Sequence, residues 1–287
     1  MNRVDKKQKS RSAWNQELDD LIRGACGGFL FGIPLLYTME VWWIGSGAEP
    51  QLMLLALGIT FGVVFLLNRT EGFRKTQSVR WPDALFDSVE AIAIGLLSAG
   101  LMLILLQQIT LSTQLKEAVG KTIYSGIPFA LGATVANQYL SSPENYSRPE
   151  EPQDNLNETL SDIGVTLIGA IFIAFNIAPT EEVPMLSSSV SGPWLIAMIG
   201  ASLLVSYGIV FQASFANQPR RRRQRGLFQN PLSETVISYL ISLIAAGLML
   251  GFFEQIEMGD PLAVWLPQTL ILGLPASIGG AAGRLVI

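Results

Sequence analysis

Eight stretches of mainly apolar residues, each about as long as a membrane span, constrain the fold of this chain more than any other feature. They lie at residues 22–43, 51–68, 84–108, 121–140, 160–178, 193–213, 234–253 and 264–285. A helix needs about 20 mainly apolar residues to cross the hydrocarbon core of a bilayer. Only 15% of the residues are charged and the mean hydropathy is +0.39, whereas a soluble domain has roughly 25% charged residues. The sequence therefore predicts an all-α integral membrane bundle with eight transmembrane helices.

The basic residues predict how these helices are oriented, because Lys and Arg are retained on the cytoplasmic side of a membrane. Fifteen of the nineteen lie in the N-terminal tail and in alternate loops, while the opposite loops hold only Lys116 and Lys121. We therefore expect both chain ends in the cytoplasm. Residues 1–21 are predicted to form a basic cytoplasmic tail, and residues 141–157, rich in Pro, Asn and Glu, a flexible cytoplasmic linker.

The two halves of the chain, residues 22–140 and 158–287, resemble each other. A shift of 147 positions aligns residues 85–140 with 232–287 at 16 identities in 56, and a shift of 142 aligns the Thr-x-Glu-Val at 38–41 with that at 180–183. Shared apolar composition would not place glycine and proline in register, so we infer a tandem duplication. Each unit has four helices, which predicts parallel repeats related by an axis along the membrane normal.

The inventory of reactive side chains argues against an enzyme. The chain has no histidine and one cysteine, Cys26, which excludes an internal disulfide and imidazole chemistry. No catalytic triad, His/Cys metal cluster or phosphate-binding Walker loop is present in the sequence. We expect no cofactor and no nucleic-acid partner.

Acidic residues at matching positions of the two halves are the candidates for function. The pairs are Asp20 with Asp162, Asp87 with Glu234, and Glu40 with Glu182. A carboxylate in the first turn of a helix is stabilised by the helix dipole, so those near the cytoplasmic ends can be purely structural. Glu90, on the same helix face as Asp87, lies deeper, and an ionisable residue inside a span is a functional candidate by default.

Glu40 and Glu182 pose a different problem from the cytoplasmic acids. If residues 22–43 form one straight helix, Glu40 lies at its outer, negative end, which does not favour a carboxylate. Each of these glutamates follows a threonine by two residues, Thr38 and Thr180. Such oxygen donors suit a hard cation. We therefore predict an outer mouth that attracts cations, with a solvated interfacial carboxylate as the alternative.

Three Gly-x-Pro elements predict interruptions inside the helices. They are Gly32 with Pro34, Gly126 with Pro128, and Gly273 with Pro275. Proline removes a backbone hydrogen bond, and the freed carbonyl must face protein or a water-lined cavity when it lies in a membrane. A cavity near these helices and a simple packing kink are both open. The Arg220–Arg225 cluster could bind anionic lipid headgroups or only fix the topology.

Three runs carry a family resemblance: LDDLIRG at 18–24, GGFLFGIPLLYTMEVWW at 27–43 and RWPDALFDSVEA at 80–91. In these runs the chain resembles a family of bacterial polytopic integral membrane proteins of about this length. That family has no assigned activity, so the resemblance transfers no functional residues. It implies a multi-pass protein of the bacterial inner membrane.

Three classes of function can be weighed against this pattern. Paired acids, helix-breaking prolines and a parallel duplication favour a cation-conducting channel or secondary transporter. A non-transporting scaffold or accessory subunit is the alternative, and a membrane-embedded lipid enzyme is a third, weakened by the missing nucleophile and metal signatures. The ion, the coupling mechanism and the oligomeric state are left open.

The predicted topology can be tested by labelling. Cysteines placed at Ser142 and Ser187 in a Cys26→Ala background should react with a membrane-impermeant thiol reagent from opposite sides of the membrane. Reaction of both from the same side would rule out the eight-span arrangement.

Overall fold

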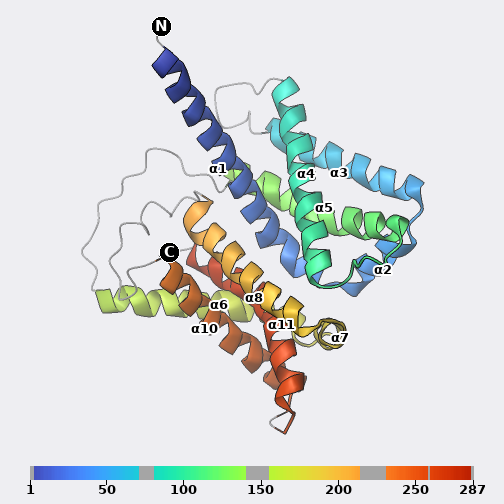
Figure 1. The fold of residues 1–287 in the computed structure, drawn as a ribbon, viewed down its shortest axis with the longest axis vertical. Helices are drawn as coiled ribbons and strands as arrows, with labels where there is room; N and C mark the ends of the chain where they lie inside the picture. Colours follow the sequence, from blue (N-terminus) through green and yellow to red (C-terminus); the bar gives the residue numbers. More distant parts are fainter. Residues whose placement is uncertain (1–2, 71–80, 140–154, 214–230, 258, 286–287) are drawn as a thin grey trace.

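The computed structural model describes residues 3–70, 81–139, 155–213, 231–257 and 259–285, and within them the fold is helical. The N-terminal half has α1 (Arg3–Leu36), α2 (Met39–Gly47), α3 (Pro50–Thr70), α4 (Trp81–Leu105) and α5 (Leu115–Tyr139). The C-terminal half has α6 (Asn155–Ile177), α7 (Glu182–Ser189), α8 (Gly192–Tyr207) with the π-helical turn η2 (Gly208–Gln212), α10 (Pro231–Phe252) and α11 (Leu262–Arg284). The two halves lie side by side (Figure 1).

Several helices are long and apolar enough to cross a membrane. Five qualify alone: α3, α4, α8 with η2, α10 and α11. Up to seven spans result if the bent pairs α1 with α2 and α6 with α7 each count as one. The prediction of an all-helical, multi-pass membrane protein is confirmed, while the count of eight stays a prediction. The predicted span at 121–140 lies in α5, whose first turns carry Lys116, Glu117 and Lys121.

The surface of the molecule is apolar and its interior is built from small residues. Leu54, Ile59 and Leu66 of α3 are exposed, as are large apolar side chains of most other helices. Alanine, glycine, serine and threonine are frequent at the buried positions. Helices in lipid gain little from burying large apolar groups against each other, and small residues let their backbones approach closely. This distribution is the one expected of a protein solvated by lipid.

The first predicted span, 22–43, is broken, and the helix of the fifth, 160–178, is followed by a second sharp bend. α1 ends at Leu36 and α2 begins at Met39 at an angle of 91°, and α6 and α7 meet at 88°. Thr38 between α1 and α2 is extended, with φ −121° and ψ 104°. The expectation of one straight helix over 22–43 is therefore wrong. Glu40 lies in the first turn of α2, where the helix dipole favours a carboxylate instead of opposing it.

Helix ends at matching positions of the two halves have the same geometry. Gln107 after α4 and Glu254 after α10 are 147 positions apart and have φ of 59° and 58°. The next residue donates its backbone N–H to the same relative carbonyl, from Gln108 to Leu103 at 2.8 Å and from Gln255 to Leu250 at 2.9 Å. Both helices thus end in a left-handed turn built without glycine.

The helix crossings also correspond between the halves. α1 packs against α5 as α6 packs against α11, and α4 packs against α5 as α10 packs against α11. A Cβ on Gly132 would lie 2.5 Å from the carbonyl oxygen of Gly27. At the matching crossing, a Cβ on Gly279 would meet the carbonyl of Gly169. Only glycine allows the two backbones to come this close.

The crossing of α6 and α11 generates a stability prediction. Gly169→Ala should lower the free energy of unfolding by about 1–3 kcal/mol, because the new methyl group overlaps the Gly279 carbonyl. Gly164→Ala is the matched control on the same helix, since no atom lies within 4 Å of its added Cβ. The melting temperatures of the two variants in detergent check this. Equal melting temperatures would show that the crossing is not tight.

Candidate functional site

The two helix breaks meet where the halves of the chain come together. The Glu182 side chain, 7% exposed, begins α7, and its Oε1 accepts a 3.3 Å hydrogen bond from the backbone N–H of Met39. Met39 is the first residue of α2, whose N-cap residue Thr38 makes no side-chain capping bond. A carboxylate from the second half therefore satisfies an amide at the start of a helix in the first half.

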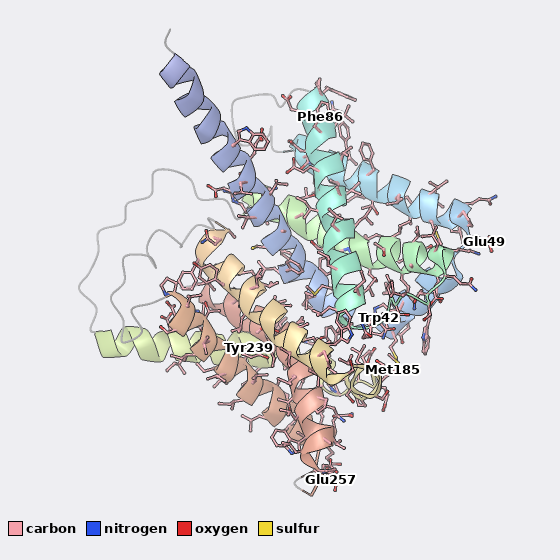
Figure 2. All side chains as sticks on the ribbon, in the orientation of Figure 1. Trp42, Glu49, Phe86, Met185, Tyr239 and Glu257 are labelled. Atoms are coloured by element: carbon pink, nitrogen blue, oxygen red, sulfur yellow. The ribbon has the colours of Figure 1, made fainter. Side chains whose placement is uncertain are left out.

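The two Thr-x-Glu-Val segments lie together but have different environments. Glu40 is exposed, whereas Glu182 is buried and hydrogen-bonded. The Thr180 hydroxyl donates to the Ile177 carbonyl at 2.7 Å and closes the end of α6. Trp42 of α2 and Met185 of α7 belong to the same apolar cluster around this junction (Figure 2). The two Thr-x-Glu-Val segments therefore meet at one junction, in which Glu182 is enclosed and Glu40 is not.

The backbone carbonyl that the Gly-x-Pro element of α11 leaves free accepts a hydrogen bond from a residue of the other half. Pro275 has no N–H, which frees the carbonyl of Ile271 four residues earlier. The buried Tyr37 hydroxyl donates a 2.8 Å hydrogen bond to that carbonyl. Tyr37 lies in the break between α1 and α2. The kink of one half is thus joined to the break of the other.

The space beside the glycines of all three Gly-x-Pro elements is filled. A Cβ on Gly32 would meet the Phe129 ring, and one on Gly126 would lie 2.8 Å from Leu96 Cδ2. A Cβ on Gly273 would meet the Leu243 side chain. Pro34 and Pro128 lie inside α1 and α5 as Pro275 lies inside α11. At these glycines the structure has close packing.

A buried ion pair holds the end of α11 against α10. The Arg284 side chain is 1% exposed and pairs with Glu234, and its Nη1 donates to the Ser238 hydroxyl at 2.9 Å. Its guanidinium also lies 5.9 Å from the centre of the Phe211 ring. Glu234, one of the candidate acids, therefore has a basic partner inside the protein. Nothing in the sequence indicates that the Arg284 side chain, at the end of a predicted span, points into the protein.

The matching region of the first half lacks this compensation. Asn137 occupies the position of Arg284, and Asp87 that of Glu234. Asp87 and Glu90 are exposed on α4, close enough to interact electrostatically with each other and with Asp20 of α1. Neither has a basic partner in the part of the chain that the structure describes. Among these residues, no group of three His, Cys, Asp or Glu is arranged to hold a metal. The candidate site on α4 and α1 is thus a group of carboxylates, those of Asp87, Glu90 and Asp20.

A third link between the halves lies at Arg23 of α1. Its Nη1 pairs with Asp20 at 2.7 Å, and its Nε donates to the Ala213 carbonyl, just after η2, at 3.0 Å. Together with the contacts of Tyr37 and Glu182, this hydrogen bond holds α1 and the start of α2 against the second half. The Arg220–Arg225 cluster and most of the linker 141–157 lie outside the described residues.

Comparison with known proteins gives a family match. A family model described as "Putative integral membrane protein (DUF2391)" matches residues 20–287. Neither the curated proteins nor the solved structures gave a match.

The ion pair of α10 and α11 generates a second stability prediction. Arg284→Gln should lower the free energy of unfolding by about 3–5 kcal/mol, because Glu234 is left without its compensating charge. Adding Glu234→Gln should recover part of that loss. Lys116→Gln, which removes the exposed Lys116–Glu49 pair, should cost less than about 1 kcal/mol. Denaturation of the four proteins in detergent checks this, and an Arg284→Gln variant as stable as the Lys116→Gln control would contradict it.

Proposed function

The chain belongs to the DUF2391 family of integral membrane proteins, and on that premise we propose that it moves a small cation across the bacterial inner membrane, as a channel or secondary transporter. The observation that carries the proposal is that the negative charge of Glu234 has a basic partner, whereas the negative charge at the matching position, Asp87, has none among the described residues. Glu234 has Arg284 as its partner. The position that matches Arg284 in the first half is Asn137.

The physical argument starts from the cost of a charge near the hydrocarbon of a bilayer. An ionised carboxylate there needs a partner, and Arg284 supplies it for Glu234. Asp87 and Glu90 have no such partner among the described residues, so a mobile cation is the natural counter-charge. Rings or lines of carboxylates attract cations in membrane pores by this means. Asp87 and Glu90 would then form the cytoplasmic entrance of the path.

The helix breaks support the same proposal. Broken helices at corresponding positions of two repeats mark the binding region in many secondary transporters. Here the breaks before Glu40 and Glu182 are at matching positions and bend by 91° and 88°. We take the halves to be parallel duplicated units of an eight-span protein with both ends in the cytoplasm. Glu40 and Glu182, with Thr38 and Thr180, would lie at the outer end of the path.

A static membrane scaffold or accessory subunit is the second candidate, and one observation favours it. The hydrogen bonds of Tyr37, Glu182 and Arg23 tie the two halves together. Such links would resist the rocking of one half against the other on which a secondary transporter relies. They are compatible with a channel, in which the halves need not rock.

The test is cation flux into liposomes that contain the purified protein. Asp87→Asn should lower flux by about tenfold or more, because a charge contact of about 1–4 kcal/mol is lost at the entrance. Asp83→Asn is the matched control, since Asp83 is an exposed carboxylate one turn earlier on α4. Added salt should reduce the difference by screening.

Two outcomes would count against the proposal. If Asp87→Asn and Asp83→Asn conduct like the parent protein at low salt, the carboxylates of α4 are not part of a path. If the folded parent protein shows no flux with any monovalent or divalent cation, the scaffold is the better conclusion.

A further inference from the structure

A ladder of aromatic rings on the outside of α3 and α4 ends on a guanidinium. Phe61 and Phe65 stack with ring centres 6.2 Å apart, and Phe65 meets the Trp81 ring at 5.5 Å. The guanidinium carbon of Arg69 lies 4.7 Å from the centre of the Trp81 ring. We call Phe61, Phe65, Trp81 and Arg69 the Arg69 ladder. The contacts run in sequence from the two phenylalanine rings of α3 to the Trp81 ring of α4 and the Arg69 guanidinium.

The ladder lies on the part of the protein that is most open to lipid. Only 17% of the apolar window of α3 is buried, the lowest share among the candidate spans. Trp81 is 59% exposed, although the Asn68 amide donates to the Ser88 hydroxyl at 3.0 Å and holds α3 to α4 beside it. Phe61 and Arg69 are eight residues apart, about 12 Å along the helix axis. That length reaches from the hydrocarbon to the headgroup level.

The charges around the ladder favour an anion. Arg69 forms no ion pair in the described part of the chain. The carboxylates of α4, at Asp83, Asp87 and Glu90, lie about 180–240° around the helix from Trp81, counted at about 100° per residue. Ala84 and Ser88, on the side of Trp81, are buried. The acidic face and the ladder are therefore on different sides of α4.

We propose that the Arg69 ladder binds one anionic phospholipid of the cytoplasmic leaflet. The lipid phosphate would lie at Arg69, whose planar guanidinium matches phosphate oxygens in a bidentate geometry. Stacking on Trp81 holds the guanidinium in place, so less side-chain freedom is lost on binding. One acyl chain would run along Phe65 and Phe61. The orientation agrees with Arg69 as a basic residue in the last turn of α3, on the predicted cytoplasmic side.

The experiment is native mass spectrometry of the purified full-length chain titrated with phosphatidylglycerol or phosphatidylcholine. We expect a preference for phosphatidylglycerol that Arg69→Gln lowers about fivefold, the contribution typical of one basic residue at a membrane surface. Trp81→Leu keeps an apolar side chain but removes the supporting ring, and it should lower the preference by a smaller factor. Lys116→Gln, at an exposed base paired with Glu49, is the control and should leave the preference unchanged.

The outcomes separate this lipid from less specific binding. An unchanged preference in both Arg69→Gln and Trp81→Leu would overturn the proposal. If the variants lose phosphatidylcholine binding as much as phosphatidylglycerol binding, the site recognises only the acyl chain and the proposal of an anionic headgroup site is wrong. If Lys116→Gln lowers the preference for phosphatidylglycerol as much as Arg69→Gln does, the preference comes from general charge attraction and not from this site. If Arg69→Gln does not fold, Trp81→Leu decides, because Trp81 is largely exposed and its replacement leaves the buried core intact.

Discussion

The hydrogen bond from the Tyr37 hydroxyl to the Ile271 carbonyl joins the two halves of the molecule at a buried backbone group that a proline has left without its helix bond. In a bilayer an unsatisfied carbonyl costs several kcal/mol, since no water can replace the missing helix bond. Pro275 frees that carbonyl, and the tyrosine comes from the break between α1 and α2. The position matching Tyr37 in the second half is Pro179, which has no hydroxyl to donate. The reciprocal bond cannot form, so the halves share a framework but are not interchangeable.

The same contrast between framework and specialised contacts recurs throughout the molecule. The close crossings of Gly27 with Gly132 and of Gly169 with Gly279 are alike, because helix approach is set by the absence of a Cβ on both backbones. The charged positions are not alike. Glu182 is enclosed while Glu40 is exposed, and Arg284 compensates Glu234 while Asn137 brings no charge to Asp87. Function, in this view, comes from the positions at which the two units differ.

Much of the framework could be predicted from the sequence, because apolar stretches of span length and glycines in register have direct structural consequences. The Gly-x-Pro element at Gly32 and Pro34 predicted an interruption in the first span, but not a bend of 91° after Leu36, since the apolar pattern continues through Leu36. A pairwise match of Thr-x-Glu-Val also cannot show that one copy is buried. The inward direction of Arg284 could not be predicted, because the direction of a long side chain depends on its partners, here from α10. The turns at Gln107 and Glu254 lack the glycine that usually marks a left-handed residue.

The meeting of the two helix breaks at one interface is the central structural claim, and proximity crosslinking tests it directly. Thr38→Cys combined with Glu181→Cys, in a Cys26→Ala background, leaves the contact between Met39 and Glu182 in place. In native membranes a short bifunctional thiol reagent should link this pair faster than it links Thr38→Cys with Ser189→Cys. Ser189 lies at the far end of α7, about 12 Å further along the helix axis than Glu181. We predict rapid linking of the first pair only. Linking of the second pair at an equal or higher rate, with all cysteines reactive, would contradict the arrangement.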